Sequence, residues 1–345
     1  MYENLKNKKI LFCSHEIGNQ MQLMVEELRK RGFYATACTY NTEWYGYVND
    51  INLNLKDNSK LMKQVKKLLF TFFAMSNYDI FHFHFGTSLF GLKILPHLDL
   101  PILKKMNKQI YVHYRGSDLL SENYYKSILS LNHENKNLNF SSRKQLKNYN
   151  IFKKYSDNIF VSTPNLLEVA KQSTIIPQII DLVYDTENNI LKKRKKEIHI
   201  LHAPTDRRKK GTNIIIDAIQ KLKNDGYNIK LEIIENIKSS DVLEYYKKCD
   251  FCIDQLLLGW YGKVTLELLS LQKPVFVNIN KKYLKYFDDI PIVNVKPENL
   301  YEKLKYHLDN PNELKDLSLK GPDYVRKYHS PEKVVEKLLN VYAKK

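Results

Sequence analysis

The sequence has little of what stabilises secreted domains or anchors membrane proteins. Its 345 residues include only four cysteines, which are Cys13, Cys38, Cys249 and Cys252. So few thiols fit a reducing compartment, where they need no disulfide partners. The sequence also has no leader with an apolar centre and no apolar run long enough to cross a bilayer. We therefore expect a cytoplasmic protein that is neither secreted nor integral to a membrane.

Metal-binding patterns are scarce as well. Cys249 and Cys252 have a redox or zinc spacing, but they begin a predicted strand, and no second cysteine pair accompanies them. His82 and His84 are same-face neighbours on another predicted strand, without a cysteine or carboxylate cluster beside them. The ordinary interpretation is buried small residues in the first case and core or cleft-lining histidines in the second. We expect no metal ion and no cofactor.

Negative charge is in short supply. The chain has 55 lysines and arginines against 38 aspartates and glutamates, a formal charge of +17. Nucleic acid, an anionic membrane surface or a lysine- and asparagine-rich genome would each explain the excess. No helix-turn-helix, zinc finger or aromatic RNA-binding signature occurs, so we expect no nucleic acid partner. Residues 61–74 mix lysines with a broad apolar face. They fit a helix at the inner membrane surface, or a core-facing helix with solvated lysines, which is the more ordinary interpretation.

The first informative segment is His202–Thr212. It overlaps an apolar run, residues 198–203, that predicts a buried parallel strand. Four cations, residues 207–210, stand between that strand and a helical pattern from Asn213, with Thr212 as its predicted cap. Open α/β sheets bind anions where a strand's carboxyl end meets a helix amino end. A diphosphate fits such a place, and the alternative is a solvated basic loop.

A second segment repeats this arrangement further along the chain. Phe251–Asp254 predicts a strand and Val264–Leu271 a helix, with Gly259 and Gly262 in the turn between them. Glycines there let the backbone approach a ligand closely.

Two charged residues follow that turn. Lys263 falls in the first turn of the predicted helix, where a cation is unfavourable unless an anion is present. Glu267 lies one turn further on, where it can accept hydrogen bonds from hydroxyls. Cations and amides for phosphate, with a carboxylate for a sugar, together predict a nucleotide-sugar site.

On these residues the sequence resembles the retaining, metal-independent glycosyltransferases of the GT-B fold. It is most similar to the family four (glycosyl transferases group 1) enzymes of bacterial surface polysaccharides, such as lipopolysaccharide or capsule. The family carries a lysine-glycine pair, an aromatic-glycine turn, a glutamate and a lysine-proline-valine start of a strand. The matching positions are Lys210-Gly211, Tyr261-Gly262, Glu267 and Lys273-Pro274-Val275. The resemblance covers nearly the whole chain.

The resemblance implies an α/β protein with two Rossmann-like doubly wound domains that face each other across a cleft. It also implies that Lys210 and either Arg207 or Arg208 neutralise the donor diphosphate. Amides from Gly262 to Val264 would bind the diphosphate too, and Glu267 would hold the ribose. The expected donor-binding set is Arg207, Arg208, Lys210, Gly211, Gly259, Tyr261, Gly262, Lys263, Val264 and Glu267.

Two positions depart from the family pattern. The family commonly has a glutamate eight residues before the one at Glu267, where this chain has Gly259. Its arginine usually stands six residues before the lysine of the lysine-glycine pair, a position held here by Pro204. Arg207 and Arg208 are the candidate substitutes for that arginine.

The amino-terminal half predicts a second doubly wound unit. Lys9–Ser14, Gln20–Arg31 and Tyr34–Thr39 form a strand-helix-strand pattern of ordinary length. The loop His15–Gln20 holds one glycine rather than the three of a dinucleotide fingerprint, so we expect no nicotinamide cofactor.

Two further predicted strands in this half, within residues 78–86 and 109–118, end in polar residues. Arg115 and Asp118 place a cation and a carboxylate around a tight turn, and we nominate them as catalytic. The alternative is that Asp118 caps the next helix. The candidates for lining the cleft or contacting the acceptor are His15, Gly18, His84 and Ser117.

The domain boundary is predicted near residue 182. Ile176–Asp181 resembles the family's hinge, and the charged stretch 185–197 has a linker-like composition. We expect an acceptor-binding domain over 1–182 and a nucleotide-sugar-binding domain over 183–345. A terminal helix at about 330–343 would cross back to the first domain, as the resemblance implies.

The predicted function is glycosyl transfer. The enzyme would move a monosaccharide from a nucleotide-diphosphate sugar to a hydroxyl of a glycan or an undecaprenyl-linked glycan. Retention at the anomeric carbon is implied by the resemblance alone. One alternative is a GT-B nucleotide-sugar epimerase, which would need paired acid and base carboxylates such as Asp118 and Glu16. The other is a non-enzymatic basic protein that binds membranes or nucleic acid, which would leave the two glycine loops unexplained.

Overall fold

A computed structural model of the protein describes residues 2–41, 46–92, 95–129, 141–181 and 197–344. The chain forms two compact units. The first contains residues 1–124, 139–179 and 331–345, and the second contains residues 125–138 and 180–330. The predicted boundary at 182–183 and most of the predicted linker lie outside the described residues.

The first unit is built on a sheet of parallel strands in the order β3-β2-β1-β4-β5-β6-β7. These strands are β1 (Lys9–Ser14), β2 (Tyr34–Thr39), β3 (Ile51–Asn52), β4 (Ile80–His84), β5 (Gln109–Tyr114), β6 (Asn158–Val161) and β7 (Thr174–Ile175). The central strands are buried on both faces because helices cover both, and apart from three histidines of β4 and β5 most of their buried side chains are apolar.

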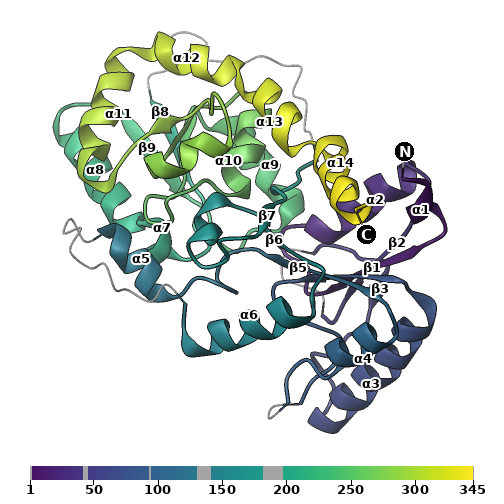
Figure 1. The fold of residues 1–345 in the computed structure, drawn as a ribbon. Coiled ribbons are helices and arrows are strands. Elements are labelled where there is room, and N and C mark those ends of the chain that lie inside the picture. Colours follow the sequence, from purple (N-terminus) through teal and green to yellow (C-terminus); the bar gives the residue numbers. More distant parts are fainter. Residues whose placement is uncertain (1, 42–45, 93–94, 130–140, 182–196, 345) are drawn as a thin grey trace. The chain divides into compact units, whose positions relative to one another are not determined.

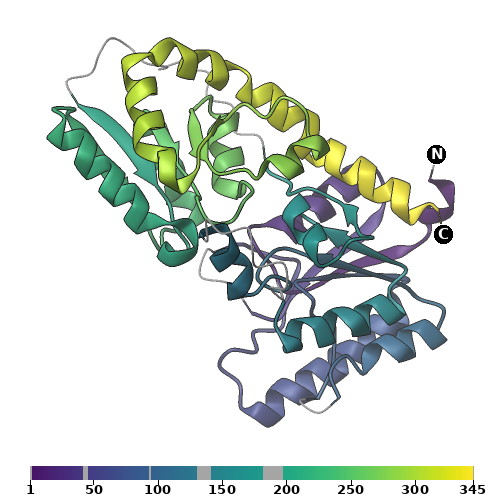
Figure 2. The ribbon, with the colours of Figure 1, turned by 60° about the vertical axis from the view of Figure 1, so that its left-hand side comes forward.

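The helices of the first unit lie in two layers. One layer holds α2 (Gln20–Lys30) and α14 (Pro331–Tyr342), and the other holds α3 (Lys60–Asn77), α4 (Asp99–Lys105) and α6 (Arg143–Tyr155) (Figures 1 and 2). The short α1 (Glu3–Lys6) precedes β1, and α5 (Glu122–Leu129) follows β5.

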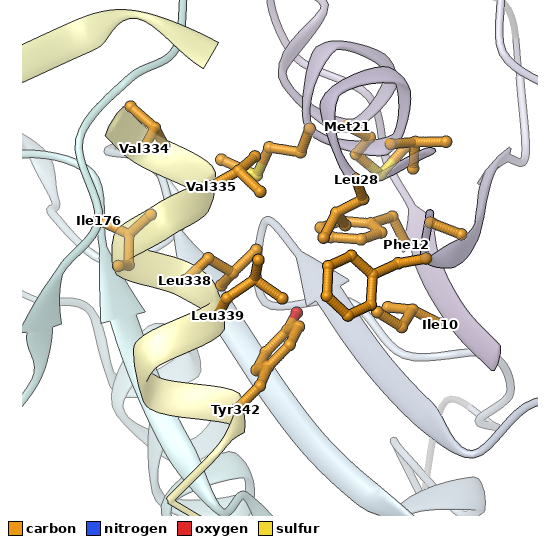
Figure 3. Close-up of a cluster of buried hydrophobic side chains, with 14 of the residues drawn as sticks. Ile10, Phe12, Met21, Leu28, Ile176, Val334, Val335, Leu338, Leu339 and Tyr342 are labelled. Atoms are coloured by element: carbon orange, nitrogen blue, oxygen red, sulfur yellow. The ribbon is translucent and has the colours of Figure 1, made fainter. Parts of the chain in front are cut away.

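The C-terminal helix α14 is part of the core of the first unit. Its buried face carries Val334, Val335, Leu338, Leu339 and Tyr342. These side chains form one cluster with residues of β1, α2 and the chain before residue 180 (Figure 3). The apolar positions recur every three or four residues, which places them on one stripe of the helix.

Shortening this stripe should destabilise the first unit. Leu338 is fully buried, so Leu338→Ala removes its buried methyl groups and leaves a cavity. We expect the free energy of unfolding to fall by about 2–5 kcal/mol, measured by urea denaturation. Glu336→Ala, on the exposed face of the same helix, should change it by less than about 0.5 kcal/mol. Equal effects of the two substitutions would contradict this role of α14.

The second unit has a five-stranded parallel sheet in the order β12-β11-β10-β8-β9. Its strands are β8 (Ile198–His202), β9 (Ile229–Ile233), β10 (Phe251–Ile253), β11 (Val275–Val277) and β12 (Val293–Asn294). Its helices are α7 (Arg207–Lys210), α8 (Thr212–Asn224), α9 (Ser239–Lys248), α10 (Lys263–Ser270), α11 (Leu300–Asp309), α12 (Pro311–Leu319) and α13 (Gly321–His329). Helices α8 and α11 lie on one side of the sheet, and α9, α10 and α13 on the other (Figure 1).

Each sheet has a point where the strand order reverses. In the second unit the chain passes from β8 outward to β9, and then from β10 outward in the opposite direction to β11 and β12. Ligands of open α/β sheets bind at such a point, beyond the carboxyl ends of the strands. The loops after β8 and β10 contain the two segments singled out above.

The interpretation of residues 61–74 as a core-facing helix is wrong. Helix α3 forms there, but its buried residues are only Phe70, Thr71, Ala74 and Met75, all in its second half. Seven large apolar side chains of α3 are exposed instead. The helical period alone could not reveal which side of the helix meets the sheet.

Candidate functional site

The structure brings the two glycine-containing segments together. Strands β8 and β10 are neighbours, with Phe251 beside Ile200 in the ladder. Beyond them, the amide of Leu256 donates to the carbonyl of Lys210 at 3.1 Å. The two loops therefore form a single surface at the carboxyl edge of the second sheet.

A buried ion pair joins these loops. The Lys210 Nζ lies 2.7 Å from Asp254 Oδ1, and both side chains are almost fully buried. Thr265 donates to the other carboxylate oxygen of Asp254 at 2.6 Å. Burial by itself would raise the pKa of Asp254, but the Lys210 charge and these hydrogen bonds hold it below its usual value. The carboxylate is therefore ionised, and the ammonium of Lys210 is matched by a full negative charge.

The prediction that Thr212 caps helix α8 is wrong. The hydroxyl of Thr212 is hydrogen-bonded to His202 Nε2 at 2.9 Å, and the other ring nitrogen of His202 lies 2.7 Å from the carbonyl of Ile253. Because a carbonyl only accepts, Nδ1 carries the proton and Nε2 accepts from the threonine. His202 thus ties β8 to both β10 and α8.

The helices that leave this surface begin without a capping side chain. Helix α8 starts after Gly211 and α10 after Gly262, and neither glycine has a side chain that could cap its helix. The helix amino end carries partial positive charge and amide donors, which favour an anion. The first unit differs here: the Glu16 carboxylate accepts from the amides of Met21 and Gln22 and so occupies the start of α2.

Glycine is favoured by backbone geometry at two of these positions. The backbone of Gly211 and Gly259 lies in the left-handed region, with φ of 79° and 68°. Gly262 has an ordinary φ, and an added Cβ there would lie 3.3 Å from Gln255 Oε1, so that side chain would have to move by a few tenths of an ångström. The glutamate that the family commonly has at position 259 would therefore be strained in this turn.

The four cations of the expected donor-binding set, which are Arg207, Arg208, Lys210 and Lys263, have different partners. The guanidinium of Arg207 is held by both carboxylate oxygens of Glu235, at 2.6–3.0 Å. Arg208 is exposed, and its guanidinium has no partner within the described parts of the chain. Lys263 pairs with Glu267 at 3.0 Å, and Glu267 also accepts from the Tyr246 hydroxyl at 2.9 Å.

Tyr261 is directed away from the surface of this site. Its side chain is buried, and its hydroxyl is hydrogen-bonded to the Tyr324 hydroxyl at 2.6 Å and to His329 Nε2 at 2.9 Å. Only the backbone of Tyr261 is therefore placed for a ligand. The next residues, Gly262, Lys263 and Val264, are at least partly accessible.

In the first unit the catalytic candidates form a turn after β5. The Asp118 carboxylate accepts from the amides of Arg115 and Gly116 at 2.7–3.1 Å, so it closes its own loop and does not cap the next helix. Burial raises the pKa of Asp118 to about 6. Loss of hydration lowers the pKa of Arg115 to about 10, although the charges of Glu16 and Asp118 oppose the shift.

The remaining candidates of the first unit lie in different environments. Ser117 is exposed, His15 is partly buried with its ring 4.9 Å from that of Phe85, and Gly18 has φ of 64°. His84, which was predicted to line a cleft, is only 1% exposed, and Arg115 Nη2 lies 3.3 Å from its Nδ1. It is therefore a core residue.

His84 belongs to a group of three buried histidines. A hydrogen-bonded chain runs from the Tyr342 hydroxyl to His82, then to His113, and ends at the carbonyl of Ile176. Their ligand atoms lie within 4.8 Å of one another, a distance that would allow a metal ion. However, Arg115 donates to His84 Nδ1, and the ring nitrogens of His82 and His113 are already engaged with Tyr342, with each other and with the carbonyl of Ile176. The residues present thus suit a hydrogen-bonded core better than a metal site.

No family model matches the sequence, and no curated protein matches it. Solved structures match over 98% of the chain.

The sucrose-phosphate synthase of Thermosynechococcus elongatus has a TM-score of 0.67 at 14% identity, with 99% of that protein covered. The Anabaena protein HepE in complex with UDP-glucose has a TM-score of 0.59 at 11% identity, fully covered. The UDP-GlcNAc 2-epimerase of Neisseria meningitidis bound to UDP-GlcNAc has a TM-score of 0.57 at 14% identity, also fully covered.

The chain has the GT-B glycosyltransferase-like fold. The expected fold class, α/β with doubly wound parallel sheets, is confirmed. No helix in the described parts of this GT-B chain is long and apolar enough to cross a membrane. All four cysteines are buried and unpaired.

Sequence reasoning missed several partners in this GT-B structure. Asp254 was visible at the end of a predicted strand, where a buried carboxylate needs a cation, but nothing in the sequence indicated Lys210 as that cation. Glu16 follows the predicted strand 9–14, so its place near a sheet edge could have been proposed. No element was predicted ahead of Glu235, which follows β9. His113 lies on a strand between apolar neighbours, and its contact with His82 depends on strand order.

Breaking the buried ion pair should destabilise the protein even without a ligand. Lys210→Ala leaves the ionised Asp254 buried and unpaired, and we expect the free energy of unfolding to fall by about 3–5 kcal/mol in urea denaturation. Lys209→Ala is the matched control, because Lys209 pairs with Asp206 at the surface at 3.4 Å and should cost less than about 1 kcal/mol. A loss below about 1 kcal/mol for Lys210→Ala would contradict the role of this pair.

Acid should lower the stability of the fold. Burial lowers the pKa of His82, His84 and His113 well below 6.5, whereas in the unfolded chain they titrate near that value. Below about pH 6.5 the unfolded state therefore binds more protons, and the free energy of unfolding decreases as the pH falls. The pKa of Asp99 and of Asp118 is raised to about 6, so between about pH 4 and 6 the folded state binds more protons at these two groups, and they increase the free energy of unfolding as the pH falls.

The histidines outnumber these two aspartates, because the pKa of His97 and of His202 is also lowered, to about 4. We expect the free energy of unfolding to be lower by about 2 kcal/mol or more at pH 5.5 than at pH 7.5, measured from urea titrations. An equal or higher value at pH 5.5 would contradict the assignment of neutral buried histidines.

Proposed function

We propose that the protein is a glycosyltransferase. It moves a monosaccharide from a nucleotide-diphosphate sugar to a hydroxyl of a glycan or an undecaprenyl-linked glycan, with retention and without a metal ion. The second unit binds the donor and the first binds the acceptor. One observation carries this proposal. Helices α8 and α10 begin after Gly211 and Gly262, without a capping side chain, in the loops that follow the neighbouring strands β8 and β10, where the strand order reverses.

The donor diphosphate is the leaving group, and its growing negative charge needs nearby positive charge. Arg208 is the cation with an open guanidinium, whereas Arg207 is held by Glu235. Lys263 stands at the first position of α10 and would add a second charge once its contact with Glu267 loosens. In this proposal the amides from Gly262 to Val264 supply further donors at the start of α10.

Lys210 has a different role in this proposal. Its ammonium is matched by Asp254 and is nearly inaccessible, so it fixes the loop from which the phosphate-binding amides project. Glu267 is partly exposed and already accepts hydrogen bonds, which suits it to the ribose hydroxyls. Asp118 and Arg115 remain the catalytic candidates, with His15, Gly18 and Ser117 on the acceptor side.

An epimerase acting on a nucleotide-sugar is the second candidate, because epimerases that share the fold are among the similar structures. Such a reaction needs an acid and a base that are free to exchange protons with the sugar. Glu16, the second carboxylate of such a pair, is held by the amides at the start of α2. Asp118 alone would have to serve as both acid and base, and this supports transfer over epimerisation.

Nucleotide binding tests the proposal directly. In a thermal-shift screen with chelator present, we expect one of UDP, GDP, ADP or CMP to raise the melting temperature, because the ligand binds only the folded state. Arg208→Ala should weaken that binding about 10- to 100-fold by calorimetry, the usual effect of losing a charged hydrogen bond.

Arg207→Ala is the matched control, since its guanidinium already has a partner, and it should change the affinity less than about threefold. No shift with any nucleotide would contradict the donor site. Conversion of the nucleotide-sugar to its epimer without an acceptor, detected by NMR, would instead establish the epimerase.

A further inference from the structure

Helix α3 exposes an apolar stripe. Leu61, Val65, Leu68, Leu69 and Phe72 recur at the spacing of one helix face, and Met62 and Phe73 widen it. The exposed fraction reaches 74% for Leu61, 64% for Leu69 and 62% for Phe72. No residue from Lys60 to Leu69 is buried, so the first half of the helix is held by few contacts with its own unit.

The charged side chains of α3 are all positive. They are Lys60, Lys63, Lys66 and Lys67, and the helix contains no aspartate or glutamate. Lys63 donates to the carbonyl of Lys56, and the Lys67 ammonium lies 5.0 Å above the ring of Tyr40. The lysines thus flank or oppose the stripe, an arrangement typical of helices that lie in a membrane surface.

This charge pattern decides between the possible occupants of the stripe. A second copy would bring two sets of lysines together on chains that each carry a formal charge of +17, at an electrostatic cost. An anionic bilayer has both an apolar interior for the stripe and negative headgroups for the lysines. With no acidic residue on the helix, the surface matches the bilayer on both counts.

The apolar surface continues past the end of α3. Phe73 lines a cavity of about 380 Å³ together with Phe33, Tyr34 and Lys9. Tyr34 is 65% exposed, and Lys9 adds a positive charge beside the aromatic rings. The exposed apolar surface is therefore larger than the helix alone.

From these observations we propose that α3 is a membrane-docking surface. The helix lies in the plane of an anionic bilayer, with Leu61, Val65, Leu69 and Phe72 among the acyl chains and Lys60 and Lys66 at the headgroups. This site is separate from the nucleotide site and does not depend on the proposed transfer reaction.

Vesicle sedimentation of the full chain tests the docking surface without any nucleotide. We expect binding to vesicles of phosphatidylcholine with about a third phosphatidylglycerol, reduced by added salt, and much weaker binding to phosphatidylcholine alone. The double variant Leu69→Gln with Phe72→Gln should bind at least about tenfold more weakly, because two side chains lose their burial in the acyl region. Both residues are exposed, so the melting temperature should stay within about 2 °C of the unaltered protein.

Leu319→Gln is the matched control, since Leu319 is an exposed apolar residue of the second unit, and it should change vesicle binding less than about twofold. Equal binding by the double variant and the unaltered protein would overturn the proposal. So would a concentration-dependent dimer, seen by light scattering, that the double variant abolishes, because the stripe would then join two copies. In each case nucleotide binding is measured separately, so a failure here leaves the donor site untouched.

Discussion

The buried ion pair of Lys210 and Asp254 is the interaction on which the candidate site depends. It joins two loops from neighbouring strands, and each loop leads into a helix that begins at a glycine. Neither charge could remain buried alone, because loss of hydration would cost several kcal/mol. The two loops must therefore keep their relative position, which gives the amides of Gly262 and the following residues a fixed direction. Under the proposed function, donor binding then requires little ordering of these loops.

The two units use the same type of sheet for different purposes. In the first unit, Glu16 satisfies the amides at the start of α2, so that helix end offers no place for a phosphate. In the second, the helix starts follow Gly211 and Gly262, which have no side chain to act as a cap. Under the proposed function, this difference separates the sheet edge that accepts a diphosphate from the one whose helix start is occupied by a carboxylate.

Sequence reasoning was most accurate where one physical pattern dominated. The central strands were predicted because parallel strands covered on both faces appear as short apolar runs, as in residues 9–14 and 198–202. It was wrong for α3, because an amphipathic period gives the apolar side of a helix but not whether that side meets a sheet or solvent. It was also wrong for Thr212, where a histidine ten residues earlier takes the hydroxyl that was expected to cap the helix.

The sequence by itself determined the α/β class, the positions of the two glycine turns and the positive charge, since all three follow from local composition and spacing. Only the tertiary structure decided which charges remain open to a ligand. Arg207 and Arg208 are adjacent and chemically identical. Glu235, which is distant in the chain, pairs with the guanidinium of Arg207, whereas Arg208 stays exposed. Such pairings depend on strand order and on the direction of each side chain, which the sequence does not encode locally.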